Sequence, residues 1–330
     1  MIINKVIKSC YELRRYNDYL TKRFYYLRNK IISQKIGVIL TLHHVINSID
    51  EINSRITPLY ITDRFLEEII RKFKKRGYSF ISIDELIFGI CKNKYIKNNK
   101  LVVVTTDDGY KDVYKNAYPI LKYYKVPFTL YVAASFPDKK AILWWHIIDK
   151  IINEEGECCK KGSLLYKYHK KILKHGINQK IALELLLKNI LSKRENIDIY
   201  CEEYNAELNK SMLIDWDDIK EMNRDPLCTI ASHGYWHFGL RYAPTYQVYR
   251  DMLVSKRILE RKLNIRVDHY AYPYGTPYSV GPREFKLALM AGYKTAVTNG
   301  KEYLYQSDFK KLFCLPRYML FENDPIMSIF

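Results

Sequence analysis

The chain has 330 residues, a net charge of +18 and 48% hydrophobic residues, so it can form one large α/β domain with a substantial core. The charge favours anionic partners, but the sequence carries no Arg/Gly-rich tract or nucleic-acid-binding motif, so we expect no nucleic-acid partner. Seven irregularly spaced cysteines fit neither a zinc finger nor a disulfide framework. No run reaches the roughly 18 apolar residues of a membrane span, and residues 1–20 lack a signal-peptide core, which favours a cytoplasmic protein.

Residues 1–35 form a basic segment in which aromatic and aliphatic side chains alternate with charges, as in Arg14-Arg15 and Lys22-Arg23. This pattern is typical of an amphipathic helix and predicts peripheral contact with an anionic membrane. A helix packed against the outside of the following domain is the alternative. Residues 36–330 form the second predicted unit.

Strands and helices alternate along most of that unit, which predicts a parallel α/β sheet. The predicted strands are 36–45, 78–82, 101–106, 126–134, 227–231, 269–273, 294–298 and 315–320. The predicted helices are 62–76 with Thr62 as N-cap, a helix capped by Asp84, 111–125, 215–222, 245–263 and 282–291. Helical patterns at about 140–212 predict an inserted helical subdomain, near whose start Trp144-Trp145 could contact a substrate or, more simply, pack in the core.

Two adjacent acids, Asp107 and Asp108, follow the apolar run Leu101–Val104 and two threonines. Burying unpaired charge is costly, so we expect the strand to end near Thr106, with the acids at its C-terminal end. That end is where α/β folds carry their sites. Gly109 allows a sharp turn there, so that both carboxylates can face one cavity. A solvated turn is the alternative.

Histidines follow two other predicted strands at the same edge of the sheet. His43 and His44 come near the end of the first strand, and His233 and His237 follow the strand 227–231. At a spacing of four, two imidazoles on one helical turn can reach one ion. One carboxylate and two imidazoles suit a catalytic zinc with an open position, and other first-row metals compete for such ligands.

Four motifs in the order of the chain resemble those of the polysaccharide deacetylases with a NodB homology domain, carbohydrate esterase family 4. Thr105-Thr-Asp-Asp-Gly109 resembles T-F-D-D-G, and Ser232-His-Gly-Tyr-Trp-His237 resembles S-H-T-x-x-H. Tyr272-Pro-Tyr-Gly275 resembles P-Y-G, and Ile39–Val45 resembles a strand with the pattern Y-H-x-V. No single motif is specific, but the four together are.

The resemblance implies a distorted (β/α) barrel of the NodB type, interrupted by the helical insertion. It implies metal-dependent removal of an acetyl group from an N-acetylated sugar or oligosaccharide, in a glycan or glycan precursor. By motif, Asp107 is the general base, while Asp108, His233 and His237 hold Zn²⁺ or another divalent first-row transition metal. The backbone N–H of Tyr274 helps to hold the oxyanion.

Several positions depart from the family pattern, and the missing Arg and the missing C-terminal His are the two departures that matter for the chemistry. Gly234 replaces the usual Thr, and His269–Tyr272 lacks the Arg that many members carry before the P-x-G motif. No histidine follows His269, so the usual C-terminal acid is missing. Members with the N-terminal histidine strand use that histidine instead, which implies His43 as the acid that protonates the leaving amine. Strand alternation then turns His44 away from the site.

The main alternative is a catalytically weak or inactive carbohydrate-binding protein of the same fold, because of the missing Arg and His. A glycoside hydrolase using Asp107 and Asp108 would need carboxyl groups flanking the bond, roughly 5 to 9.5 Å apart, and would leave the His pair unexplained. Binding of nucleic acid through charge alone would be strongly salt-dependent.

Overall fold

The computed structural model describes residues 33–48, 59–92, 100–141, 143–147 and 202–325. The predicted basic segment therefore lies almost entirely outside the described residues, as do residues 148–201 of the predicted insertion. The described part of the insertion includes a helical stretch at 144–147 and α8 (Glu202–Met212). Within the described ranges, no helix combines the length and the apolar character that crossing a membrane requires.

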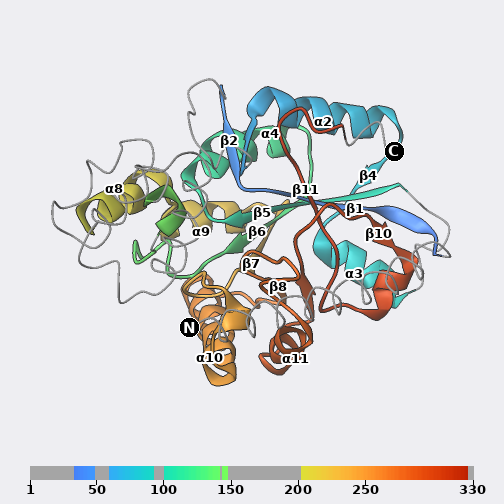
Figure 1. Cartoon of the computed structure of the whole chain (residues 1–330). Helices are drawn as coiled ribbons and strands as arrows, with labels where there is room; N and C mark the ends of the chain where they lie inside the picture. Colours follow the sequence, from blue (N-terminus) through green and yellow to red (C-terminus); the bar gives the residue numbers. More distant parts are fainter. Residues whose placement is uncertain (1–32, 49–58, 93–99, 142, 148–201, 326–330) are drawn as a thin grey trace, which may run out of the picture.

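A mixed sheet of nine strands forms the centre of the molecule (Figure 1). Its main path runs β10-β1-β5-β6-β7-β8-β9, while β11 pairs with β1 and β4 pairs with β5. All these pairs are parallel except β10 with β1. The strands are β1 (Lys35–Leu42), β4 (Ser79–Phe80), β5 (Leu101–Asp108), β6 (Phe128–Val132), β7 (Cys228–Ser232), β8 (His269–Ala271), β9 (Thr295–Val297), β10 (Leu304–Tyr305) and β11 (Tyr318–Met319). β2 (His44–Ile46) and β3 (Tyr60–Thr62) form a small parallel sheet.

The C-terminal segment bridges the two sides of this curled sheet. Leu315 forms a parallel bridge with Val297 of β9, and Tyr318 of β11 pairs with Leu40 of β1. The segment 315–319 therefore lies between a late strand and the first one, and we call it the closing segment. The curled sheet with its outer helices confirms the predicted distorted barrel of the NodB type.

Two clusters of buried apolar residues lie on the two faces of the sheet, one inside the barrel and one outside it. The inner cluster joins alternate residues of the strands to Ile83 and Leu86 of α3 (Ile83–Cys91), and its strand members include Ile39, Val103, Tyr131, Ala231, Ala271 and Val297. The outer cluster lies between the sheet and the surrounding helices. These helices are α2 (Asp63–Lys75), a π-helix (Val113–Ala117), α4 (Tyr118–Tyr123), α9 (Trp216–Arg224), α10 (Thr245–Leu263) and α11 (Pro282–Met290).

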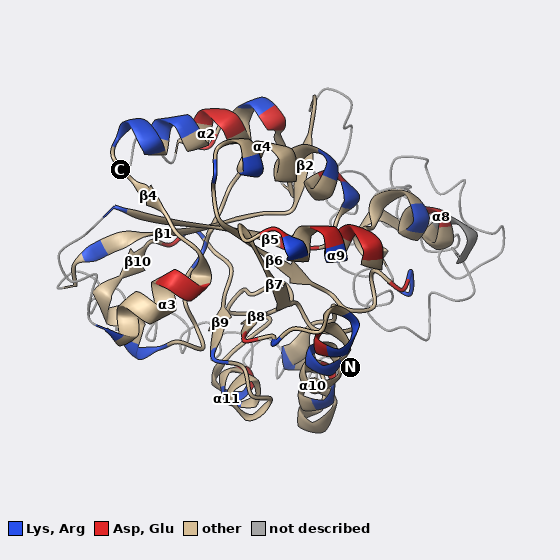
Figure 2. Ribbon diagram, turned by 180° about the vertical axis from the view of Figure 1, so that it is seen from behind, with Lys and Arg blue, Asp and Glu red and all other residues tan. Residues whose placement is uncertain are grey.

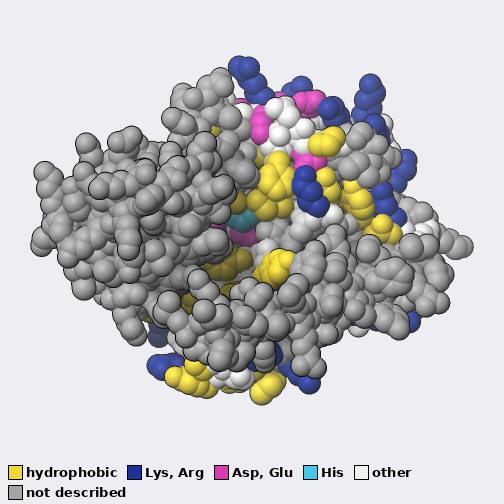
Figure 3. All heavy atoms as spheres, in the orientation of Figure 1, with side chains coloured by type: hydrophobic (Ala, Val, Ile, Leu, Met, Phe, Trp, Pro, Cys, Tyr) yellow, Lys and Arg dark blue, Asp and Glu magenta, His cyan; other side chains and the backbone are white. Residues whose placement is uncertain are grey.

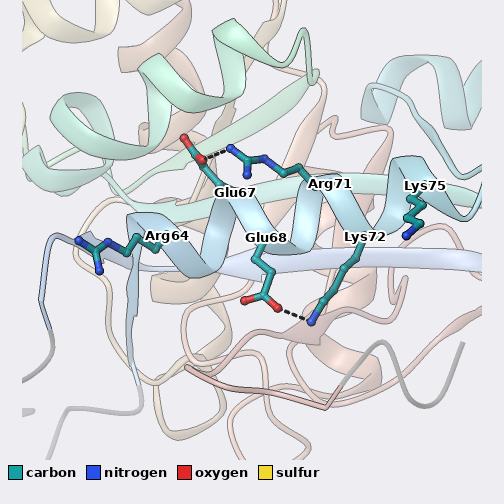
Figure 4. Close-up of a pocket in the computed structure, with 6 residues that line it drawn as sticks. All are labelled: Arg64, Glu67, Glu68, Arg71, Lys72 and Lys75. Carbon is teal, nitrogen blue, oxygen red and sulfur yellow. Dashed lines mark hydrogen bonds and ion pairs between the residues drawn. The ribbon is translucent and has the colours of Figure 1, made fainter.

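α2 begins at the predicted N-cap, since the Thr62 hydroxyl accepts a 3.1 Å hydrogen bond from Phe65 N. One face of the helix is buried, and the other carries the i,i+4 ion pairs Glu67–Arg71 and Glu68–Lys72. The shallow hollow on this face is lined by charged side chains of α2 alone (Figure 4). Figure 2 shows the same distribution elsewhere, with many of the charges on outer helices and few on the central strands.

The beginning of α3 differs from the prediction. Ser82, not Asp84, caps the helix, because its hydroxyl accepts a 3.0 Å bond from Glu85 N while the Glu85 carboxylate accepts one from Ser82 N. The Asp84 carboxylate instead lies 3.0 Å from His269 Nε2, at the start of β8. This hydrogen bond lowers the pKa of Asp84. α3 thus covers the N-terminal ends of the strands, opposite the acidic pair.

Candidate active site

Three buried side chains at two strand ends form a cluster that fits a divalent metal ion. Asp108 ends β5, and His233 and His237 follow β7. Asp108 Oδ1 lies 3.3 Å from His233 Nε2 and 3.1 Å from His237 Nε2, and one ligand atom from each residue lies within 4.8 Å of the others. Asp108 Oδ1 is buried without a hydrogen-bond donor among the described residues. A buried carboxylate oxygen facing two imidazole nitrogens matches the donors that zinc and similar ions prefer.

The segment that carries both histidines is a loop, so the predicted helical turn is wrong. Gly234 has φ +78° and His237 has φ +53°, values that no right-handed helical turn contains. A Cβ atom on Gly234 would lie 2.8 Å from Asp251 Oδ2, which explains why the usual Thr is absent. Asp251, on α10, accepts hydrogen bonds of 2.9 and 3.0 Å from the backbone N–H groups of Tyr235 and Trp236. The buried Asp251 carboxylate therefore holds the histidine loop in place.

Different contacts orient the two imidazoles. His233 Nδ1 lies 2.8 Å from the Ala271 carbonyl oxygen, so this nitrogen donates and Nε2 faces Asp108. His237 Nδ1 is buried without a hydrogen-bond partner in the described part of the chain. The His237 ring packs instead among three aromatic rings, at centroid distances of 5.8, 5.1 and 5.0 Å, from Phe136, Trp145 and Tyr274. Packing fixes His237 where a hydrogen bond fixes His233.

The neighbouring carboxylate, Asp107, points into the barrel and pairs with a buried arginine. Arg317 Nη1 and Nη2 each donate a 2.6 Å hydrogen bond to Asp107, one to each carboxylate oxygen. The guanidinium also donates to the Thr298 carbonyl oxygen at 2.9 Å and lies over the Tyr131 ring. This arginine comes from the closing segment, far along the chain from the stretch before the P-x-G motif, and the motifs did not predict it. The only signal was a charged residue inside a predicted apolar strand.

The surroundings of both acids favour their ionised forms. Burial by itself raises the pKa of Asp107, but the charge and hydrogen bonds of Arg317, together with His233, outweigh it and hold the pKa below its usual value. Burial likewise opposes ionisation of Asp108, yet the contacts with His237 and His233 bring its pKa well below the usual value. Asp107 is therefore ionised at neutral pH.

The two N-terminal histidines point to opposite sides of the sheet. His43 Nε2 lies 3.9 Å from Asp107 Oδ2. Burial lowers the pKa of His43, although the nearby Asp107 raises it, so this imidazole is neutral at pH 7. His44 Nδ1 lies 2.6 Å from Asp112 Oδ2, and the His44 ring stacks on Tyr60. Of the two, only His43 lies on the side of Asp107.

Tyr274 lies on the loop after β8 with φ +62°, and Asp108 shares this left-handed conformation with φ +74°. Such values are uncommon outside glycine and concentrate at functional sites, at a cost of about 1–3 kcal/mol each. The Tyr274 hydroxyl donates to the His237 carbonyl oxygen at 3.4 Å and accepts from Trp144 Nε1 at 2.9 Å. Its backbone N–H is not among the groups that donate to other described residues, which leaves it available to an oxyanion.

Figure 3 shows a recess in the surface of the molecule with histidine and acidic side chains at its bottom and hydrophobic side chains beside them. The described side chains around His237 are aromatic, since the rings of Phe136, Trp145 and Tyr274 pack against its imidazole. Trp145 is buried, and its Nε1 donates a 3.0 Å hydrogen bond to Tyr110 OH. A small polar centre with aromatic walls is a usual form for a small-molecule site.

A curled parallel sheet whose mouth holds a candidate metal cluster beside a second, ionised carboxylate is the arrangement of a hydrolase that activates water. Residues 94–295, more than half of the chain, match the family model described as polysaccharide deacetylase. The chain therefore belongs to the polysaccharide deacetylase family, as its motifs predicted, and is an enzyme of the carbohydrate deacetylase class. No protein with a curated description matches it.

Solved structures of deacetylases share the fold. The Streptococcus pyogenes deacetylase PplD, in complex with acetate, is 19% identical with a TM-score of 0.56, covering 88% of this chain and 93% of its own. A de-N-acetylase from Aggregatibacter actinomycetemcomitans is 18% identical with a TM-score of 0.57, covering 86% of this chain and 94% of its own. IcaB from Ammonifex degensii is 18% identical with a TM-score of 0.56, covering 89% and 94%. At these identities the likeness concerns the fold.

We predict that Arg317→Lys moves the acidic limb of the pH profile of kcat/KM to higher pH. Arg317 lowers the pKa of Asp107, and lysine cannot make the same two parallel hydrogen bonds, so Asp107 should need a higher pH to ionise. Activity would then be lost at acidic pH first. The measurement is a pH–rate profile, with thermal unfolding measured alongside because breaking a buried ion pair costs about 3–5 kcal/mol. Lys294→Gln, which removes a surface charge paired with Asp268, is the control. An acidic limb at the wild-type position would contradict this role for Arg317.

Proposed function

We propose that this protein removes the acetyl group from the nitrogen of an N-acetylated sugar, in a glycan or glycan precursor of a cell-surface polysaccharide. The observation that carries the proposal is the buried Asp108–His233–His237 cluster beside the ionised carboxylate of Asp107. We infer that Zn²⁺, or another divalent first-row transition metal, binds there. The acetate complex of one structural relative and the de-N-acetylase name of another support this class of reaction.

A bound divalent ion would supply a Lewis acid that polarises the amide carbonyl and lowers the pKa of water. Asp107 would accept the proton of the attacking water, because Arg317 keeps this carboxylate ionised and fixed in orientation. The backbone N–H of Tyr274 would donate to the oxyanion. One such donor is typically worth about 3 kcal/mol in the transition state.

The leaving amine needs a proton before its bond to carbon breaks, and we assign its delivery to His43. His43 is neutral at pH 7, so it cannot bring that proton from the free enzyme. Its Nε2 lies 3.9 Å from Asp107 Oδ2, a separation that one bridging water would span, and through that water His43 would receive the proton that Asp107 has taken. The proton would then pass from water through Asp107 and His43 to the amine.

The competing interpretation was a weak or inactive carbohydrate-binding protein. It depended partly on the missing arginine, and Arg317 now occupies the place beside Asp107. The described cluster also keeps a complete set of metal-binding donors. We therefore favour the active enzyme.

We also propose, from the composition alone, that the enzyme works in the cytoplasm at an anionic membrane surface, without a nucleic-acid partner. Its net charge of +18 and the basic residues 1–35 support such contact. Glycan precursors carried on lipids would be accessible there.

We predict that the purified protein carries about one divalent first-row metal ion per chain and releases acetate from N-acetylhexosamine compounds, with loss of activity on chelation. His233→Ala and His237→Ala should remove most of the metal.

The Asp107→Asn variant should keep the metal and lose activity by orders of magnitude, because an amide cannot take the proton. Elemental analysis and acetate release measure these effects. His269→Asn, at the opposite end of the barrel, is the control, and retained metal in both histidine variants would refute the cluster.

We predict an asymmetry between the two N-terminal histidines. His43→Ala should depress kcat strongly on amide substrates at unchanged metal content, but much less on an activated ester, whose leaving group needs no proton. His44→Ala should have mild effects on both substrates. If the proton reaches His43 from Asp107, amide turnover should persist above pH 7. A fall in kcat/KM as the pH rises through a value below 6.5 would instead identify cationic His43 of the free enzyme as the acid.

We predict that deleting residues 1–34 releases the protein from vesicles of anionic lipid without changing turnover of a soluble substrate. Each Lys or Arg near such a surface contributes roughly 1 kcal/mol. Co-sedimentation with anionic and with neutral vesicles measures the effect. Equal binding of full-length and truncated chains to the anionic vesicles would disprove this role.

A further inference from the structure

A half-buried tryptophan lies one aromatic ring away from the proposed metal site. The Trp144 ring is 6.1 Å from the Tyr274 ring and 5.3 Å from the Trp145 ring, measured between centroids. Both of these rings pack against the imidazole of His237, at 5.0 and 5.1 Å. Trp145 is buried, whereas Trp144 and Tyr274 keep part of their surface exposed. The aromatic wall of the metal cluster therefore reaches solvent at Trp144 and Tyr274.

The polar atom of the Trp144 indole, Nε1, is already hydrogen-bonded. Its Nε1–H donates to the Tyr274 hydroxyl at 2.9 Å, so the exposed part of the indole offers an apolar ring surface and no free donor. The same bond fixes the orientation of the indole relative to the loop that carries Tyr274. A surface that is ordered before binding loses little entropy when a ligand covers it.

We propose that Trp144, oriented by Tyr274, is the surface on which the pyranose ring bearing the acetamido group lies. One face of a pyranose presents C–H groups, which pack on an aromatic ring, while the hydroxyl groups at the rim stay hydrated. The acetamido group can then extend past Tyr274 toward Asp108 and His237. This inference rests on the proposed function and deepens it, because it makes Trp144 a specificity residue for a closed-ring N-acetylhexosamine. An open-chain N-acetylated compound would lack the contact.

The test compares Trp144→Ala with Trp144→Phe and Tyr274→Phe, using a tetrasaccharide of N-acetylglucosamine as the probe. Trp144→Ala should raise KM about tenfold with a much smaller change in kcat, which is the scale of one well-placed aromatic contact. Trp144→Phe keeps a ring and should stay within about threefold of the wild-type KM. Tyr274→Phe keeps both rings but frees the indole N–H, and should give an intermediate KM. Tyr246→Ala, which removes an exposed aromatic ring on α10, is the matched control and should leave KM unchanged.

A purely structural role for Trp144 would change different kinetic parameters. If Trp144→Ala lowered kcat or metal content at unchanged KM, or if Trp144→Phe were as impaired as Trp144→Ala, Trp144 would only hold the His237 loop, and the proposal would fall. Calorimetric binding of the same tetrasaccharide to the Asp107→Asn protein gives a second measurement that needs no catalysis. There Trp144→Ala should weaken binding about tenfold, and equal binding would overturn the inference. If the wild type released no acetate while binding still depended on Trp144, the deacetylase function would fail and the sugar surface would stand.

Discussion

Two adjacent carboxylates, Asp107 and Asp108, are buried at one strand end, and buried charges are stable only when each is paired. The structure gives each acid its own partner. Asp107 follows the strand alternation into the barrel, where Arg317 meets it with two hydrogen bonds. Asp108 leaves the alternation through its φ of +74° and turns toward the two histidines. Neighbours in sequence thereby receive different environments and can serve different chemical roles.

This division of roles places demands on distant parts of the chain. The partner of Asp107 lies 210 residues away, and it reaches the barrel interior because the closing segment bridges β9 and β1. Additional contacts hold this end of the chain, since the Asp324 carboxylate accepts from Tyr318 OH at 2.8 Å and from Lys301 Nζ at 3.0 Å. Closing the barrel and setting the charge of Asp107 are therefore the same structural event. A mutation that loosens the closing segment would affect both.

The partners of Asp108 depend on local backbone geometry instead. Three residues of the site, Asp108, His237 and Tyr274, adopt left-handed conformations that disfavour ordinary side chains. Compensating contacts come from outside the site, above all from Asp251 on α10, which binds two backbone N–H groups of the histidine loop. The aromatic rings around His237 add packing beside its Nδ1, which has no hydrogen-bond partner among the described residues. The barrel supplies the strand ends, and the outer helices and aromatic wall hold the loops in strained positions.

The sequence by itself determined the parallel α/β architecture, the helices α2, α9, α10 and α11, and the motifs that carry the site, because hydrophobic periodicity and short motifs are local properties of a chain. It also separated His43 from His44, since alternation along a strand assigns neighbours to opposite faces. Only the tertiary structure decided that Arg317 is the partner of Asp107, that residues 233–237 form a loop, and that Asp84 bonds His269 instead of capping α3. Each of these depends on contacts between residues far apart in the chain, or on a left-handed backbone that burial and remote hydrogen bonds enforce. No periodicity in the sequence encodes such contacts, because their energy comes from groups that meet only once the barrel has closed.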